Sequence, residues 1–198
     1  MDAITLVQQC APVIEPTLAI RLLRRESGFN PYAIGLDGKA VLKPQPRTFV
    51  EAVKIADDLL RAGKKFSVGI SQVHISNVKN FGLTWAQAFD PCTNLRHGQT
   101  ILQHFHNVAL KAGFSGEGAV FAALRGYNSG SVHASISNNY ANAIMGGGLP
   151  ASIPNVRINI DSSMDERKMP AHADAADIFS TPNERVRADG QAKEIFEE

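Results

Sequence analysis

Helix-forming sequence fills about the first three quarters of this 198-residue chain and stops at three consecutive glycines, residues 146–148. Before them, apolar residues recur at the helical period in short segments that are separated by Gly, Pro, Asn and Asp. A short β-branched segment at residues 66–73 is typical of one strand or extended turn. The chain is therefore predicted to be mostly α-helical. The expected helices cover residues 3–9, 16–27, 48–62, 75–81, 94–112, 115–125 and 131–145.

The sequence after Gly148 has a different character. It holds four prolines, many acidic residues and few large apolar ones. A segment that buries so little apolar surface cannot offset the entropy of ordering its backbone. We therefore expect one domain over residues 1–148 and a flexible tail over residues 149–198, with a partner-binding or cleavable segment as the alternative interpretation of the tail.

The charge of the two parts excludes one class of partner. Residues 1–148 hold 14 Lys and Arg against 9 Asp and Glu, and residues 149–198 hold 6 against 10, so balances of +5 and −4 give the net +1. A mildly basic domain suits an anionic polymer, although random surface charge explains it equally well. It lacks the basic stripe interleaved with aromatics that marks a nucleic-acid interface. No apolar run is long enough to cross a bilayer.

Glu26 is the strongest candidate for acid–base chemistry. It opens the segment E-S-G-F-N at the end of a predicted helix, and Leu22 and Leu23 lie on the same helix face. Burial against leucines and the negative end of the helix both disfavour the charged carboxylate. Glu26 is thus predicted to be a general acid near neutral pH. The competing interpretation is a solvated glutamate that pairs with one of three nearby arginines.

Two later segments complete a known pattern. F-S-V-G-I-S-Q-V occupies residues 66–73 and A-A-L-R-G-Y-N-S-G occupies residues 122–130. With Glu26 and in this order, they resemble the lytic transglycosylase family, whose fold is related to goose-type lysozyme. The segments C-A-P, N-P-Y-A-I-G and D-P-C-T-N-L are similar to the peptidoglycan-cleaving component of type IV secretion and conjugation systems. The resemblance covers about residues 10–143 and implies a lysozyme-like α-helical domain.

The resemblance implies roles for the first two segments. Glu26 would be the catalytic acid, and Ser27 would hold the acid or a nearby sugar. Gly69, Ser71 and Gln72 match a Gly-Leu-Met-Gln segment in which Ser71 replaces the usual Met. Gln72 would offer a donor and an acceptor to an acetamido group, with a turn-stabilising amide as the alternative.

The third segment supplies an expected partner for the acid. Tyr127 and Asn128 match an Ala-Tyr-Asn segment in which Gly126 stands in place of alanine. The Tyr127 hydroxyl would donate to Glu26 and orient its carboxyl, whereas the alternative is a half-buried core tyrosine. Asn128 would cap backbone groups at the helix end or bind sugar.

Glycosidic cleavage often uses a second carboxylate. Asp37 in a D-G turn, Asp90 before proline and Glu117 in a first helical turn each have a sufficient structural explanation. The absence of a second acid fits the single-glutamate mechanism of the family, in which the C6 hydroxyl attacks and a 1,6-anhydromuramoyl end forms. A hydrolytic muramidase and a catalytically weak wall-binding assembly protein are the alternatives.

No metal or cofactor is predicted, because the histidines lack paired metal spacing and no phosphate-binding loop is present.

Cys10 and Cys92 are too few for a disulfide framework and too isolated for a zinc site, which leaves two free thiols or one bridge.

The N-terminus has an acid at position two and no basic region, so it is not a signal peptide as written. The resemblance implies export to the periplasm with a missing leader, where a Cys10–Cys92 disulfide is expected. It also implies peptidoglycan strands, and secretion-system subunits, as partners.

Overall fold

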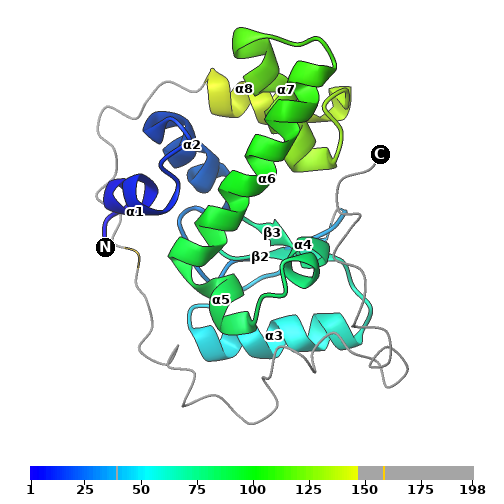
Figure 1. Cartoon of the computed structure of the whole chain (residues 1–198). Helices are drawn as coiled ribbons and strands as arrows, with labels where there is room; N and C mark the ends of the chain where they lie inside the picture. Colours follow the sequence, from blue (N-terminus) through cyan, green and yellow to red (C-terminus); the bar gives the residue numbers. More distant parts are fainter. Residues whose placement is uncertain (39, 147–157, 159–198) are drawn as a thin grey trace, which may run out of the picture.

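The computed structural model describes residues 1–38, 40–146 and 158, and within them eight α-helices and one 3-10 helix accompany a three-stranded sheet (Figure 1). The prediction of a mostly α-helical domain with a short β segment is confirmed. The strands are β1 (Ile34–Leu36), β2 (Phe66–Val68) and β3 (Val73–His74). The helices are α1 (Ala3–Cys10), α2 (Pro16–Ser27), α3 (Phe49–Arg61), α4 (Ile75–Asn80), α5 (Trp85–Phe89), α6 (Pro91–Lys111), α7 (Gly116–Ser129), η1 (Ser135–Ser137) and α8 (Asn138–Met145).

Among the described residues, the largest of three hydrophobic cores belongs to what we call the helical lobe, formed by α1, α2, α6, α7 and α8. The smallest core lies between α6 and α7. The long helix α6 crosses the middle of the molecule and packs along α7 and α1 (Figure 1). Each large apolar side chain that is fully buried stabilises the fold by about 1.5–3 kcal/mol relative to exposure. The fully buried side chains of this core include Leu6, Ile20, Leu22, Leu23, Leu95, Leu124 and Ile144.

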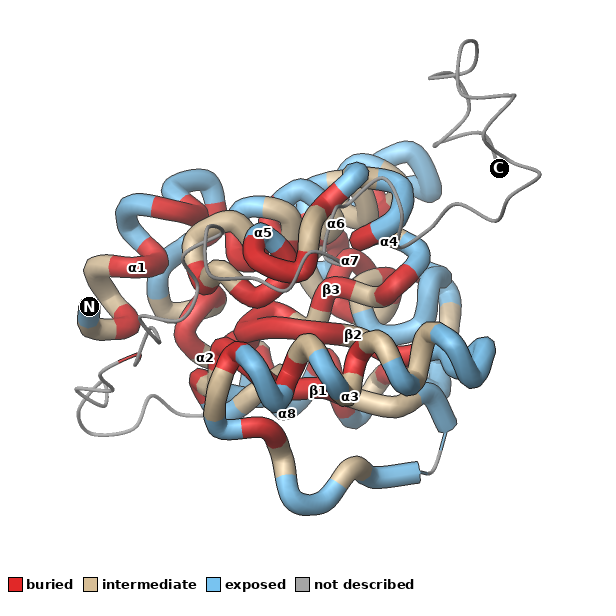
Figure 2. Tube along the Cα trace, turned by 90° about the horizontal axis from the view of Figure 1, so that it is seen from below, coloured by how far each residue is buried: buried red, intermediate tan, exposed pale blue. Residues whose placement is uncertain are grey.

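The second core lies in the sheet lobe, which comprises β1–β3 with α3, α4 and α5. The three strands are antiparallel in the order β1-β2-β3, and Ile34 pairs with Val68 while Ser67 pairs with His74. Buried residues line the strands and the inner side of α3 (Figure 2). Aromatic rings dominate this core, among them Phe49, Phe66, Trp85 and Phe89.

The boundaries of α2 follow from local sequence signals. Pro16 occupies the first turn, where a missing N–H costs nothing, and the Glu15 carboxylate accepts the N–H groups of Thr17 and Leu18. Gly28 ends the helix in a left-handed conformation with φ 59°. The helix predicted for residues 16–27 therefore forms as expected, with Glu26 in its last turn.

Several segments differ from the expectation. The segment 66–73 forms two strands joined by a turn, and residues 34–36, expected in a loop, pair with it as β1. Helix α6 begins at Pro91 with Asp90 as its N-cap rather than at Asn94. The stretch 131–145 is a turn, a 3-10 helix and the shorter α8.

Covalent and noncovalent links secure the N-terminal helix. A disulfide joins Cys10 at the end of α1 to Cys92 in the first turn of α6, with a sequence separation of 82 and the Cα atoms 5.2 Å apart. The N–H of Ile158 donates to the Met1 carbonyl at 3.0 Å, and the Ile158 side chain is buried in the helical core. Apart from Ile158, the predicted tail and its boundary at residue 148 lie outside the described residues.

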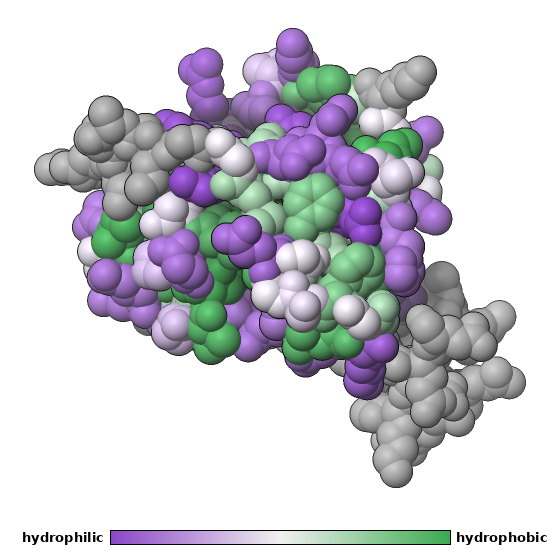
Figure 3. Space-filling view, turned by 90° about the horizontal axis from the view of Figure 1, so that it is seen from above, coloured by the Kyte–Doolittle hydropathy of each residue, from purple (hydrophilic) through white to green (hydrophobic). Residues whose placement is uncertain are grey.

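On the side of α7 and α8, the surface formed by the described residues is of mixed character. Seen from there, hydrophobic patches alternate with hydrophilic side chains (Figure 3). Within residues 1–38, 40–146 and 158, no helix is both long and apolar enough to span a bilayer.

Candidate active site

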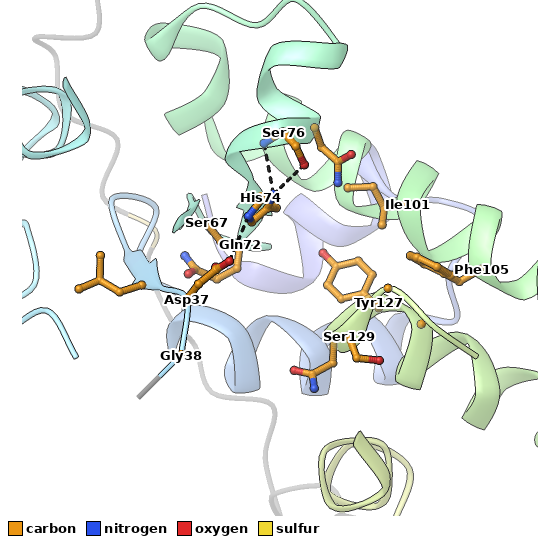
Figure 4. A pocket seen from close by; sticks show the side chains of 15 residues that line it. Asp37, Gly38, Ser67, Gln72, His74, Ser76, Ile101, Phe105, Tyr127 and Ser129 are labelled. Atoms are coloured by element: carbon orange, nitrogen blue, oxygen red, sulfur yellow. Dashed lines mark hydrogen bonds and ion pairs between the residues drawn. The ribbon is translucent and has the colours of Figure 1, made fainter. Parts of the chain in front are cut away.

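A cleft of about 640 Å³ runs between the sheet lobe and the helical lobe (Figure 4). A smaller cavity of about 160 Å³ shares six of its residues and adds Glu26 and Gly35. The acid therefore lies beside the cleft, within reach of what binds there. The residues that line the cleft are Leu36, Asp37, Gly38, Ser67, Gln72, His74, Ser76, Asn77, Ile101, Phe105, Gly126, Tyr127, Asn128, Ser129 and Gly130.

Glu26 has the electrostatics of a general acid. The side chain is partly buried, and the Tyr140 hydroxyl donates a hydrogen bond to its carboxyl oxygen. Burial raises the pKa of Glu26 to about 7, against the smaller lowering effects of the Tyr140 hydrogen bond and the Arg25 charge. Within the described residues no arginine lies within ion-pair distance of this carboxyl, so the interpretation of a solvated, paired glutamate is wrong. A carboxyl with this pKa is able to give and to take a proton near neutral pH.

The expected bond from Tyr127 to Glu26 is wrong. The Tyr127 hydroxyl donates instead to the Ser71 carbonyl at 2.6 Å, because α7 directs it toward the turn between β2 and β3. The ring still lines the cavity beside Glu26, and burial first, then the Glu26 charge, raise the pKa of Tyr127. The residue that the sequence interpretation missed is Tyr140 on α8. Tyr140 lies in the predicted helix 131–145 and is buried in the structure. Because the hydroxyl of a buried tyrosine usually finds a hydrogen-bond partner, a tyrosine in this helix was the one available sign of a partner for Glu26.

A buried amide holds the turn between β2 and β3. The Asn94 side chain is fully buried; its amide nitrogen donates to the carbonyls of Val68 and Ala88, and its oxygen accepts from the Ser71 N–H at 2.8 Å. Gly69 has φ 82°, and a Cβ there would lie 2.2 Å from the Asn94 amide nitrogen. Gly69 thus allows the close approach of the turn to α6. The sequence pattern predicts Asn94 at a helix start and carries no signal for this contact with the turn.

Ser71 and Ser27 support the turn from two sides. Ser71 is fully buried, and its hydroxyl donates to the Asn94 oxygen at 2.8 Å, so it faces away from the cleft. The Ser27 hydroxyl donates to the Ile70 carbonyl at 2.7 Å, which ties the turn to the residue after Glu26. Ser27 therefore anchors the helix end that carries the acid and makes no contact with the carboxyl itself.

Gln72 and Asn128 line the cleft, and both amide groups already donate hydrogen bonds within the protein. The Gln72 nitrogen donates to the Ala33 and Gly69 carbonyls at 3.0 and 2.8 Å. The Asn128 nitrogen donates to the Ser137 hydroxyl at 2.9 Å. Because an amide has two N–H groups, both donors of Gln72 are engaged, whereas Asn128 keeps one N–H and its oxygen for a ligand.

Helices α6 and α7 approach closely at Gly126. A Cβ on this glycine would lie 2.4 Å from the Phe105 ring. The absence of a side chain at Gly126 allows Phe105 to pack over α7, where it forms part of the cleft wall.

Of the three acids weighed as a second carboxylate, one reaches the site. Asp90 caps α6, the position that the sequence pattern predicted for Asn94, and Glu117 lies in the first turn of α7 as its sequence context predicts. Asp37 lines both the cleft and the cavity of Glu26, and its carboxylate lies 3.4 Å from His74 Nε2. In the part of the chain that the structure describes, no three His, Cys, Asp or Glu side chains gather into a candidate metal centre.

Comparison with known proteins identifies the family to which this part of the chain is similar. The model of the "Transglycosylase SLT domain" family matches residues 5–144, which include every residue of the cleft. The "Type IV secretion system protein virB1" of Brucella abortus biovar 1 (strain 9-941) and that of Brucella suis biovar 1 (strain 1330) are each 42% identical over 128 residues. The match covers 64% of this chain and 53% of each relative, so the chain spans about half the length of the curated relatives it matches. No solved structure matches the chain significantly.

Proposed function

The chain belongs to the transglycosylase SLT domain family, and from this membership and the cleft we propose that it is a peptidoglycan lytic transglycosylase. It cleaves the β-1,4 bond between MurNAc and GlcNAc and leaves a 1,6-anhydromuramoyl end. The observation that carries the proposal is Glu26, whose burial beside a polar cleft raises its pKa to about 7.

The reaction needs one carboxyl in two protonation states. Protonated Glu26 donates its proton to the glycosidic oxygen, and the bond from that oxygen to the anomeric carbon breaks with its electron pair on the leaving oxygen. The C6 hydroxyl of the same muramoyl unit attacks the cationic carbon and gives its proton to the Glu26 carboxylate. No water is consumed and the acid is regenerated. A pKa near the working pH suits both steps.

Neighbouring residues orient the acid and the glycan. Tyr140 fixes the carboxyl through its hydrogen bond. Gln72 offers its amide oxygen to the N–H of an acetamido group, because both of its own N–H groups are engaged, and Asn128 offers its oxygen and one N–H. Ser27, Gly69 and Ser71 act indirectly, by holding the turn that carries Gln72 against α2 and α6.

The biological setting that we propose is the periplasm, where the enzyme opens the wall locally so that a type IV secretion or conjugation apparatus can assemble. Two observations support it. The similar Brucella proteins are named as type IV secretion system proteins. The Cys10–Cys92 disulfide also suits an oxidising compartment.

Muropeptide analysis of purified sacculi treated with the purified protein tests this function. We expect 1,6-anhydromuramoyl products from the parent and about 10²–10⁴-fold slower release from Glu26→Gln, whose amide cannot exchange the proton. Reducing ends instead of anhydro ends would identify a hydrolytic muramidase. Sacculus binding without turnover, equal in the parent and Glu26→Gln, would identify a wall-binding assembly protein.

A further inference from the structure

Asp37 is a second carboxylate of the cleft that no step of the mechanism above uses. It follows β1 directly and lines the cavity of Glu26 from the sheet lobe. Its backbone N–H donates to the Lys65 carbonyl at 3.2 Å, which extends the pairing of β1 with β2. The backbone position of the carboxylate is therefore set by the sheet rather than by a free loop.

Two residues, Ser76 and His74, orient this carboxylate in sequence. His74 Nδ1 accepts from the Ser76 N–H at 3.2 Å and lies 2.7 Å from the Ser76 hydroxyl. Because Nδ1 serves as an acceptor, the ring proton is on Nε2, which faces the Asp37 carboxylate at 3.4 Å. Figure 4 shows Asp37 directed toward His74 and Gln72 at the edge of the cleft.

This arrangement aims the Asp37 charge without cancelling it. An imidazole whose Nδ1 accepts hydrogen bonds is neutral. Among the residues that the structure describes, no lysine or arginine lies within ion-pair distance of Asp37. A negative charge in a groove that a glycan fills acts in a drier medium than bulk water, where it interacts more strongly.

Glycosidic cleavage creates the charge that Asp37 suits. As the bond to the leaving oxygen breaks, positive charge develops on the anomeric carbon. We propose that Asp37 stabilises this positive charge from the sheet lobe while Glu26 transfers the proton, and that His74 is the residue that positions Asp37. The proposal rests on the proposed function and adds a second electrostatic group to it. Asp37 accepts no proton and forms no covalent bond.

The test compares Asp37→Asn, which removes the charge at nearly constant size, with Asp58→Asn, a matched control on exposed α3 outside the cleft. Initial rates of anhydromuropeptide release are measured over a range of sacculus concentrations, and binding is measured by co-sedimentation. Removal of a preorganised charge partner costs about 10²–10³-fold in buried sites. For half-exposed Asp37 we expect about a 10–100-fold lower maximal rate, with binding within about twofold of the parent.

His74→Asn tests the positioning role. Asparagine keeps the capping function at the start of α4 but is too short to reach Asp37. We expect about a three- to tenfold rate loss in the parent background and no further loss in the Asp37→Asn background, the non-additivity of a coupled pair. Equal losses in both backgrounds would overturn the positioning role.

Two outcomes overturn the role of Asp37. One is a rate for Asp37→Asn within twofold of the parent, and the other is a loss that arises entirely from weaker sacculus binding. The proposed function is judged separately by the products of the parent. Reducing ends would overturn the lytic mechanism, and the rate of Asp37→Asn relative to the parent would still test the role of Asp37. A parent without any turnover would overturn both proposals.

Discussion

The two lobes contribute different kinds of side chain to the cleft. The helical lobe supplies Glu26 and Tyr140, which meet in a partly buried hydrogen bond. The sheet lobe supplies Asp37 and Gln72, which remain partly or largely exposed and are fixed by contacts with the histidine ring or the backbone. The difference follows from physical need: a raised carboxyl pKa requires burial, whereas recognition of a polar sugar requires side chains that still face the solvent.

The largest expected effect tests whether proton transfer belongs to the helical lobe alone. Glu26→Gln should lower the rate of muropeptide release by about 10²–10⁴-fold, because the amide cannot replace a general acid. The fold should persist, as a thermal melt would show. If the variant keeps more than half of the parent's activity, Glu26 is not the general acid, and the assignment of proton transfer to the helical lobe is wrong.

The next effect tests how far the helical lobe depends on its covalent link. Replacement of both Cys10 and Cys92 by alanine should lower the free energy of unfolding by roughly 4 kcal/mol in the chain-entropy model, given a loop of 82 residues. Denaturant unfolding measures the loss, and thiol titration of the unreduced, denatured parent should find no free thiol. A loss below about 1 kcal/mol would show that the noncovalent core holds α1 by itself.

A third effect uses stability to report the burial of Glu26. The folded pKa of about 7 exceeds the ordinary value of 4.5, so this group's contribution to stability is fully present below pH 4.5 and is lost as pH rises through 7. Between pH 4.5 and 8 the parent should lose about 2–3 kcal/mol relative to Glu26→Gln, allowing for solvent screening. Urea unfolding of both proteins at the two pH values gives the difference. Parallel pH dependences would indicate a solvated carboxyl.

The smallest effect separates two tyrosines of the helical lobe. Tyr140→Phe removes a donor that favours the charged carboxylate, so the pKa of Glu26 should rise and the alkaline limb of the rate profile should move to higher pH. The rate at the optimum should fall by about tenfold or less.

Tyr127→Phe removes only the bond to the Ser71 carbonyl, at a cost of about 1 kcal/mol of stability. Tyr127→Phe should leave the alkaline limb of the rate profile unchanged. An equal shift of the limb in both variants would contradict the assignment of Tyr140, rather than Tyr127, as the donor to Glu26.

The features that the sequence predicted are those with local causes. Pro16, the apolar period of α2 and Gly28 determine a helix and its end within a dozen residues, so the placement of Glu26 follows without knowledge of the rest of the fold. The resemblance of short motifs likewise identified the turn that contains Gly69 and Gln72.

The features that sequence reasoning missed depend on contacts between distant segments. Tyr140 reaches Glu26 across 114 positions, and Asn94 reaches the turn across 23. Strand β1 exists because β2 pairs with it, whereas its own sequence lies among turn signals. Asp37 was explained by its D-G turn, and only the fold shows that this turn faces the acid. Hydrogen-bond partners of this kind have no periodicity in sequence.

The close contact of Gly126 with Phe105 has a consequence for engineering by consensus. Restoring the residue that is common at a family position is a frequent route to stability, and Gly→Ala inside a helix ordinarily gains up to about 1 kcal/mol. Here the added methyl group would meet the Phe105 ring at 2.4 Å. Overpacking of this kind costs about 1–3 kcal/mol and would displace a wall of the cleft. The alanine of the family pattern is therefore the wrong residue for this chain, whose glycine is matched to its own phenylalanine.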